Sequence, residues 1–459
     1  MSGSEKRNII FSLSPLLYLF VFVITFRLCF DIDPLHGPHQ TSLFLAGLLA
    51  LIQRNGKIHS KSALILALKR NFFSVYPAML ILCLVGMLIG AWANAGVLGS
   101  MIDLGIRMLS PDFFLPGIAI LCGISAVVSG SSWTTAGTLG LALMGVGNLL
   151  GFPPEVTAGA IVSGCYFGDK LSPLSDTTIL ASSLTEVPLP THIRYMVKTT
   201  LPSFLVSLLL YSVWNFFHLP SETPLNTLSD SLFLSSSLHF EYWNLLPVVL
   251  VFGFSMFGVR AYISLGIGIL SSCFFSFQRG AQPIDIVSSL VFGFHSSSGD
   301  PNLDVLLSGG GFLAIFPTEC LILTAVWFGG ILEGMGYLSE LLISLKQWIH
   351  EKWDVLLATM GSSFLLNLTT ADQYLSLVVP ARAFRNLAHE YEIEGKEVSR
   401  ALEDSGTISS PLIPWNSCGA FMATSLKIST IAYLPYVWFN LIHIFFAIAL
   451  ILFRRTKKN

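Results

Sequence analysis

Two polar stretches interrupt long apolar runs of this sequence, and they carry residues suited to binding an ion. The first is Gly168-Asp-Lys-Leu-Ser-Pro-Leu-Ser-Asp-Thr-Thr178, which sets two carboxylates, a lysine and four hydroxyls beside a proline. The second, Glu403-Asp-Ser-Gly-Thr-Ile-Ser-Ser-Pro-Leu-Ile-Pro-Trp-Asn416, offers the same oxygen groups with two prolines. Proline interrupts a helix and frees backbone carbonyls. Carbonyl, hydroxyl and carboxylate oxygens are the ligands that hard cations take, so both stretches are predicted to bind a cation.

Two further polar stretches lie where apolar runs meet in pairs. Runs 113–132 and 134–150 meet at one polar tip, and runs 353–370 and 372–390 meet at the other. Each pair predicts a re-entrant hairpin, whose polar tip lies within the membrane. The tips contribute further oxygen-bearing side chains, namely Ser131, Ser132, Thr134, Thr135, Asn367, Thr369, Thr370 and Asp372.

The composition indicates a membrane protein. Of the 459 residues, 53% are hydrophobic and only 11% are charged, against about 25% charged in a typical soluble domain. A helical span takes about 20 residues, so there is room for ten or more membrane segments in the bilayer. The net charge of −2 excludes a basic surface for nucleic acid. A charge at a helix centre costs about 2.5–3.5 kcal/mol, so charged stretches at that depth indicate a site.

The fold class is therefore an all-α polytopic membrane protein. We expect about ten spans plus two re-entrant hairpins, with broken helices at 155–187 and 396–427 because these runs are too long and too interrupted to be straight. The predicted parts are N-terminal spans with an amphipathic cytoplasmic segment (1–71), a first repeat (72–218), linking spans (219–311), a second repeat (312–453) and a cytoplasmic tail (454–459).

Matching residues support the repeat. An offset of 240 lays 76–102 on 316–342 without gaps and matches Gly96 with Gly336. An offset of 238 matches the Ser-Pro-Leu triplets that begin at Ser172 and Ser410, and it also overlays the polar tips. Charge placement puts the two hairpins on opposite faces, so the repeats are predicted to be inverted, as is typical of secondary transporters with a site near the midplane.

Charge also predicts the orientation. Basic residues gather at 6–7, 54–70, 192–198, 382–400 and 454–458. All these clusters fall on one face, which the positive-inside rule makes cytoplasmic, together with both termini. Arg260, between two apolar runs, is interpreted as a cytoplasmic anchor. The helices outside the repeats, 11–53 and 199–277, are candidate surfaces for a homodimer.

The predicted site combines the four polar segments. A cation and a proton compete for the oxygens of a buried carboxylate, so one site can exchange them by alternating access. The first candidates are Asp169 and Asp176, followed by Asp372 and Asp404. The predicted cation- or proton-binding residues are Asp169, Ser172, Asp176, Thr177, Asp372, Asp404, Ser405, Thr407 and Asn416.

Two assignments have explicit alternatives. Asp169 could instead be neutralised by Lys170, but adjacent residues on a helix do not face each other. Glu333, within the apolar run 312–345, is a candidate proton relay, and the alternative is a hydrogen bond that packs helices together.

The polar stretches resemble those of a known family. The blocks 130–138, 168–178, 371–375 and 402–419 are similar to those of the NhaC-type sodium/proton antiporters, within the ion-transporter superfamily of paired hairpins and broken helices. The resemblance implies exchange of Na⁺ (or Li⁺) for H⁺ across a cell inner membrane, with Na⁺ held at the cation-binding residues and no cofactor beyond the transported ions. The sequence departs from the family pattern at Ile179, where an amide is usual, and at Ser308, where a basic residue is usual.

The resemblance leaves the substrate open, because the family includes exchangers similar to malate–lactate antiporters. A Na⁺- or H⁺-coupled exchanger of organic acids or amino acids is therefore the alternative, and an arginine in the chamber would favour it; the four polar segments contain none. An intramembrane enzyme would need a nucleophile–base pair or a metal motif such as HExxH. The sequence has neither, so we expect no enzyme.

Overall fold

Helices make up the described part of the chain. The computed structural model describes residues 3–29, 37–54, 61–219, 242–297, 304 and 307–456. Within these ranges the only strand-like feature is an isolated antiparallel bridge between Phe294 and Gly309. Six of the described helices are long and apolar enough to cross a membrane. The all-α prediction is confirmed, while residues 220–241 of the predicted linking segment and 457–459 of the predicted tail lie outside the described residues.

The N-terminal helices stand beside the second half of the chain. α1 (Gly3–Cys29) and α2 (Pro38–Arg54) pack together, and α2 also packs against α16 (Phe316–Gly334). The long α3 (Lys61–Asn94) packs against α16 as well. α3 and α16 are the corresponding helices of the two predicted repeats, and they pack directly against each other.

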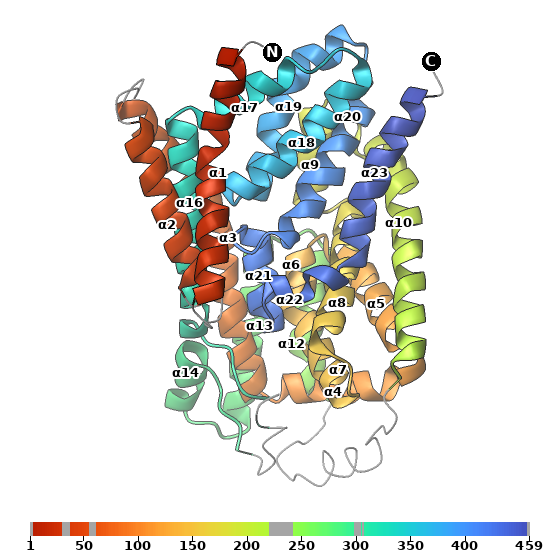
Figure 1. Cartoon of the computed structure of the whole chain (residues 1–459). Coiled ribbons are helices and arrows are strands. Elements are labelled where there is room, and N and C mark those ends of the chain that lie inside the picture. Colours follow the sequence, from red (N-terminus) through yellow and green to blue (C-terminus); the bar gives the residue numbers. More distant parts are fainter. Residues whose placement is uncertain are drawn as a thin grey trace.

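The hairpin of the first half lies near one end of the molecule. Figure 1 shows α5 and α7 in the lower half, above α4, which lies across the base. The helices of this half are α4 (Val97–Met108), α5 (Phe114–Ser129), α6 (Ser132–Thr135), α7 (Leu141–Leu149), α8 (Pro154–Leu171), α9 (Asp176–Leu184) and α10 (Leu189–Phe217). The helix break falls at 172–175, inside the stretch where Pro173 and its polar neighbours predict it.

The second half is arranged the other way up. Figure 1 shows α18 and α19 at the top, where both termini lie. Its helices after α16 are α17 (Tyr337–Lys346), α18 (Lys352–Thr370), α19 (Gln373–Glu390), α20 (Gly395–Leu402), α21 (Ser417–Leu426), α22 (Thr430–Tyr433) and α23 (Trp438–Thr456). A π-helical turn over Glu403–Thr407 and a 3₁₀ turn over Ser410–Leu412 break the helix between α20 and α21.

Corresponding turns recur in the two halves. Gly96 and Gly336 both have positive φ, 72° and 77°, and each precedes a short helix. At the hairpin tips, Gly130 and Ala371 both adopt the left-handed conformation. The tips therefore correspond at Gly130 and Ala371. The offset between these two residues is three residues larger than the offset between the Ser-Pro-Leu triplets.

The linking segment contains apolar helices of different length. A 3₁₀ turn over Tyr242–Leu245 leads directly into α12 (Leu246–Met256), and together they form an apolar helical segment over Tyr242–Met256, which is shorter than the roughly 20 residues of an ordinary span. α13 (Ala261–Gln278) is longer and packs against α3. α12 and α13 lie in the lower half of Figure 1. α14 (Pro283–Phe292) follows.

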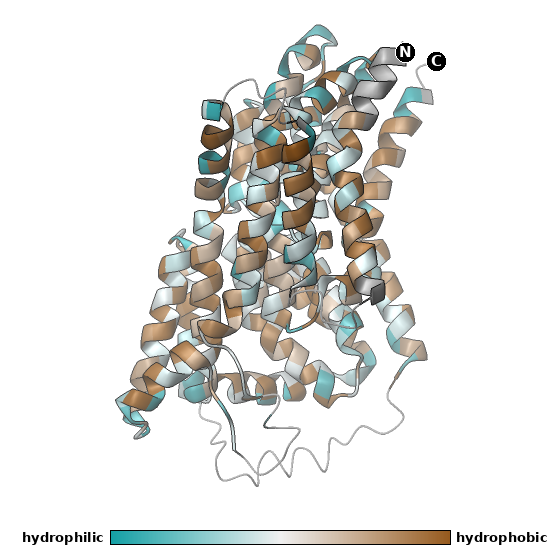
Figure 2. Cartoon of the chain, turned by 60° about the vertical axis from the view of Figure 1, so that its left-hand side comes forward, coloured by the Kyte–Doolittle hydropathy of each residue, from teal (hydrophilic) through white to brown (hydrophobic). Residues whose placement is uncertain are grey.

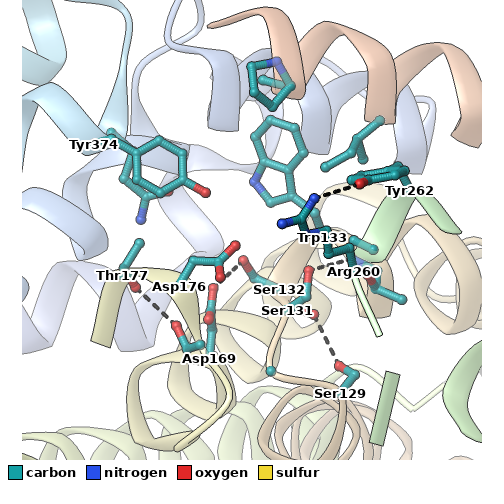
Figure 3. A pocket seen from close by; sticks show the side chains of 18 of the residues that line it. Ser129, Ser131, Ser132, Trp133, Asp169, Asp176, Thr177, Arg260, Tyr262 and Tyr374 are labelled. Atoms are coloured by element: carbon teal, nitrogen blue, oxygen red, sulfur yellow. Dashed lines mark hydrogen bonds between the residues drawn. The ribbon is translucent and has the colours of Figure 1, made fainter. Parts of the chain in front are cut away.

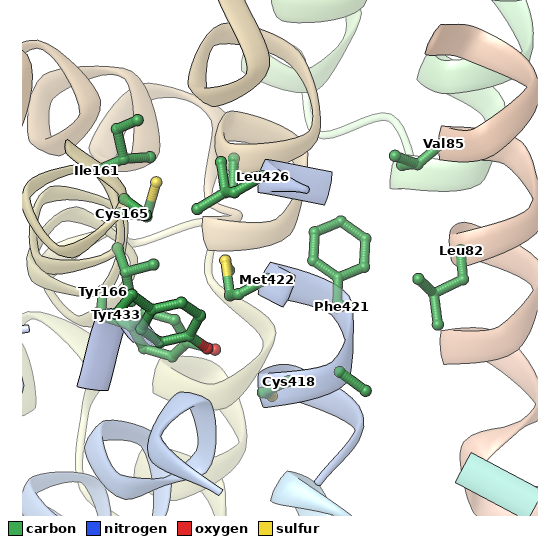
Figure 4. Close-up of a cluster of buried hydrophobic side chains, with 14 of the residues drawn as sticks. Leu82, Val85, Ile161, Cys165, Tyr166, Cys418, Phe421, Met422, Leu426 and Tyr433 are labelled. Atoms are coloured by element: carbon green, nitrogen blue, oxygen red, sulfur yellow. The ribbon is translucent and has the colours of Figure 1, made fainter. Parts of the chain in front are cut away.

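Apolar residues face both outward and inward. Figure 2 shows apolar residues along much of the outer helices, and Leu17, Phe73 and Leu209 are 61%, 69% and 63% exposed. Such exposure is suited to lipid rather than water. Inside, residues of α3, α8 and α21 form a buried apolar cluster, which Figure 4 shows around Phe421 and Tyr166. This core holds the two broken helices against α3.

Candidate functional site

A cavity of about 470 Å³ lies where both hairpin tips meet the first helix break. α3 and the turn between α12 and α13 complete its wall. Its polar lining includes Ser129, Ser131, Ser132, Thr134, Asp169, Ser175, Asp176, Thr177, Arg260, Tyr262, Asp372, Gln373, Tyr374 and Ser417. The two hairpin tips and the first break thus share one cavity, which part of the predicted set lines, whereas the predicted residues of the second break do not line it.

Asp169 is the buried carboxylate of this cavity. It lies at the end of α8 and is 7% exposed, and its Oδ2 accepts a hydrogen bond of 2.6 Å from the Ser132 hydroxyl of the first tip. Lys170 makes its ion pair elsewhere, so it does not neutralise Asp169. The carboxylate therefore faces a hydroxyl and a cavity rather than a fixed cation.

The break after α8 is held by Ser172. Its hydroxyl donates to the Val127 carbonyl at 2.7 Å and accepts from the Leu174 backbone N–H at 3.2 Å. Ser172 does not line the cavity. Its contacts fix the turn that ends one helix and sets the start of the next.

Asp176 and Thr177 begin α9 on the same side of the cavity (Figure 3). The Thr177 hydroxyl lies 3.1 Å from that of Ser175. The exposed carboxylate of Asp176 has no hydrogen bond or ion pair with another described residue. It is available to a ligand.

The second tip contributes Asp372 through a helix cap. Its Oδ1 accepts from the backbone N–H groups of Tyr374 at 2.7 Å and Leu375 at 3.2 Å, which satisfies two donors at the start of α19. Ser131 caps the first tip in the same way, accepting from the Thr134 N–H at 3.1 Å. Each tip thus presents a capping oxygen to the cavity.

Asp404 lies in a separate, fully buried cluster. Its Oδ1 is 2.7 Å from Lys170 Nζ and 2.9 Å from His443 Nε2, and its Oδ2 is 3.5 Å from Arg400 Nε. Thr199 donates to the same carboxylate at 3.4 Å. The second break therefore supplies an ion-pair cluster, and Asp404 does not line the cavity.

The other predicted residues of the second break are buried and also lie outside the cavity lining. Ser405 donates to the Met360 carbonyl at 2.7 Å. Asn416 donates to the Asn367 carbonyl at 3.1 Å and accepts from the Cys418 N–H at 3.0 Å. Thr407 is fully buried in the π-helical turn. These contacts hold the break against the second tip.

The remaining tip residues bond mainly to backbone. Asn367 donates to the Gly406 carbonyl at 2.5 Å, whereas Thr369 and Thr370 donate to carbonyls one turn earlier in their own helix. The Thr135 hydroxyl lies 3.2 Å from that of Ser129. None of these four lines the cavity.

Glu333 connects two helices. It pairs with Arg70 and accepts a hydrogen bond of 2.9 Å from Asn71, so it joins α16 to α3. It does not line the cavity. These contacts support the packing role that the sequence left as the alternative to a proton relay.

Sequence reasoning missed several charged groups. Arg260 was interpreted only as a cytoplasmic anchor; it is exposed, and it also lines the cavity beside Tyr262. Arg400 was counted among the surface basic residues, but it is 2% exposed and lies over the Tyr195 ring at 4.9 Å. His443 lies in the middle of an apolar run. The imidazole of His443 within an apolar run was the available signal for a buried partner. Arg400 lies among polar residues in the sequence and gave no such signal.

The two departures from the family pattern lie in different places. Ile179 lines the cavity, so its apolar side chain changes the wall. Ser308 does not line it, and the Lys427 ammonium donates to the Ser308 carbonyl at 2.8 Å. A positive charge is therefore present next to Ser308 although residue 308 is not basic.

Comparison with known proteins supports the resemblance. Residues 164–454 match the Na⁺/H⁺ antiporter family. The chain belongs to this family. A relative in the family, the Na⁺/H⁺ antiporter NhaC of Alkalihalophilus pseudofirmus, is 33% identical over 95% of this chain and 93% of its own length.

Relatives that are named for other substrates also share 32–39% of their aligned residues with this chain. The arginine/ornithine antiporter ArcD of Halobacterium salinarum is 39% identical over 80% of this chain and 76% of its own length. The malate-2H⁺/Na⁺-lactate antiporter of Bacillus subtilis is 32% identical over 93% of this chain and 90% of its own length. Among solved structures, the YdaH transporter of Alcanivorax borkumensis aligns over 97% of both chains with 11% identity and a TM-score of 0.39.

Proposed function

We propose that this protein is a secondary transporter that exchanges Na⁺ (or Li⁺) for H⁺ by alternating access. The observation that carries the proposal is the Asp169 carboxylate, buried at a helix break, facing a cavity and bonded to the hydroxyl of Ser132. Na⁺ and H⁺ are substrates here, and no resident cofactor is part of the mechanism.

The chemistry follows from competition for oxygen atoms. A desolvated Na⁺ needs several oxygen ligands, and Asp169 with neighbouring hydroxyls and the carbonyls freed at the break is such a set. A proton on Asp169 removes the negative charge that attracts the cation. Binding of one ion therefore displaces the other, which couples their movements.

The proposed organisation is two inverted repeats, 72–218 and 312–453, around this cavity. The opposed hairpins in Figure 1 support it, as do the left-handed residues Gly130 and Ala371 at corresponding tips. Relative motion of such repeats exposes a central site to each side in turn. We further propose a cell inner membrane with both termini in the cytoplasm, supported by the positive-inside pattern.

The test uses inside-out vesicles that report a proton gradient with a pH-sensitive dye. Added Na⁺ or Li⁺ is expected to dissipate the gradient with the unmodified protein and not with Asp169→Asn. Asp103→Asn, which removes a partly buried carboxylate paired with Arg107 outside the cavity, is the control and should behave as the unmodified protein. An Asp169→Asn protein with full exchange activity would refute this site.

An exchanger of organic ions remains a second candidate. A cavity of about 470 Å³ is far larger than a single Na⁺ requires and lies within the range of about 300–1,000 Å³ typical of small-molecule sites. The relatives named for arginine and ornithine and for malate and lactate support the same alternative. If protons move only after an organic substrate is added, this candidate replaces the first.

A further inference from the structure

The turn between α12 and α13 brings a guanidinium into the cavity. Arg260 precedes α13 and lines the cavity together with Gly258, Val259 and Tyr262. Figure 3 shows Arg260 and Tyr262 on one side of the cavity, and Asp169, Asp176 and Thr177 on the other. The two walls therefore carry opposite charges.

These opposite charges do not neutralise each other. Within the described ranges Arg260 forms no ion pair, and its hydrogen-bond partner is the Tyr262 hydroxyl, which accepts from Nη1 at 3.0 Å. A guanidinium has five N–H donors in a planar fork that matches a carboxylate. Most of these donors remain available, and the Tyr262 O–H is free to donate in turn.

The position of Arg260 gives its charge access to the cavity. Arg260 is exposed and follows α12 directly before α13, so its guanidinium is open to a ligand in the cavity that it lines. Asp176 lines the same cavity and has no ion pair with another described residue. The cavity, at about 470 Å³, is large enough for an organic molecule.

We propose that the cavity binds a zwitterionic amino acid, with its carboxylate on Arg260 and Tyr262 and its ammonium group on Asp176 and Asp169. This inference rests on the proposed function in taking the cavity as the transport site. A cavity with a cationic wall and an anionic wall is complementary to a ligand that carries both charges. A ligand lacking either charge leaves one wall without a partner.

Binding to the purified protein tests the proposal. The unfolding temperature is measured with glycine, L-serine, L-leucine, L-glutamate and L-arginine, and each is compared with its α-amide and its N-acetyl derivative. At least one free amino acid is expected to raise the unfolding temperature, and both of its derivatives should fail because each lacks one charge. Failure of the whole panel, equal binding of an amide, or a response to malate alone would overturn the proposal.

Substitutions assign the carboxylate contact. Arg260→Gln is expected to raise the half-saturating concentration about ten- to a hundredfold, the loss expected for a hydrogen bond to a charged group. Arg260→Lys, which keeps the charge without the fork, and Tyr262→Phe should each cause a smaller rise. Arg107→Gln removes an exposed guanidinium outside the cavity and should bind as the unmodified protein. Unchanged affinity in all three cavity variants would refute the role of Arg260, and the two milder variants decide the question if Arg260→Gln does not fold.

The two proposals fail separately. Na⁺-driven proton movement in vesicles without amino acids tests Na⁺/H⁺ exchange alone, and amino-acid binding tests the zwitterion site alone. If Na⁺ moves protons but no amino acid binds, only the zwitterion site is refuted. If an amino acid binds through Arg260 but Na⁺ moves no protons without it, only simple Na⁺/H⁺ exchange is refuted.

Discussion

Asp169 and Asp404 are two buried aspartates with different surroundings. Asp169 meets a hydroxyl and a cavity, whereas Asp404 meets Lys170, Arg400 and His443. A carboxylate that faces a cavity can exchange one cation for another. A carboxylate held by the cations of its own chain is already compensated, so Asp404 is better suited to joining the two breaks than to carrying an ion.

This difference predicts a loss of stability at Asp404. Asp404→Asn leaves Lys170 and Arg400 buried without their carboxylate, so we expect the free energy of unfolding to fall by about 3–5 kcal/mol. The measurement is denaturant unfolding of the purified protein in detergent.

The comparison for that measurement is Asp103→Asn. Asp103 also pairs with a cation, Arg107, but the Arg107 side chain is 49% exposed, so solvent screens the pair and its loss should cost no more than about 1 kcal/mol. Equal losses at the two aspartates would contradict the structural role of the buried cluster.

At the scale of elements, each broken helix is positioned by the tip of a hairpin. Gly130 lies so close to the first break that a Cβ there would be 2.6 Å from Leu174 Cβ and 2.8 Å from its carbonyl carbon and oxygen. Its φ of 70° is also in the left-handed region, which favours glycine. The tip and the break therefore fit together only without a side chain at position 130.

Gly130→Ala is expected to push the tip away from the break. Strain of about 1–2 kcal/mol from the left-handed backbone adds to the clash, so the initial rate of Na⁺-dependent proton exchange should fall about tenfold or more. Vesicle assays at matched protein amounts measure this rate.

Gly253→Ala in α12 is the matched control. A Cβ at Gly253 would meet no atom within 4 Å, so the rate should remain that of the unmodified protein. A Gly130→Ala protein as active as this control would show that close contact between tip and break is not required.

At the scale of the whole molecule, the two hairpins occupy opposite ends. Figure 1 shows α4 across the base and α19 in the half that carries the termini. The exposed Ser110 lies between α4 and the first hairpin, and the exposed Glu390 ends α19. In a background without native cysteines, Ser110→Cys should react with a membrane-impermeant maleimide only from outside the cell. Glu390→Cys should react only after the cytoplasmic face is opened.

The same labelling also tests the orientation. A cysteine placed in the C-terminal tail should behave like Glu390→Cys, because both lie at the end of the molecule that carries the termini. Labelling of Ser110→Cys and Glu390→Cys from the same side would contradict opposed hairpins, and reversed labelling would contradict cytoplasmic termini.

Local signals in the sequence predicted much of the candidate site. Pro173 and its polar neighbours predicted the first break, and the structure interrupts the helix at 172–175. The polar run around Ser132 predicted a tip that reaches Asp169. The place of Arg260 in the cavity lining was not predicted, because a single arginine between two apolar runs has the same local pattern at a surface as at a cavity.

The sequence by itself determined the helical membrane class, the helix breaks and the oxygen-rich chemistry, because composition, proline and apolar run length act through neighbouring residues. Only the tertiary structure decided which polar residues share a cavity and which pair with each other. Lys170 and Asp404 are 234 residues apart, and Ser132 and Asp169 are 37 apart. Such contacts depend on how distant helices pack against each other. This packing places Arg260 in the cavity lining and pairs Asp404 with Lys170.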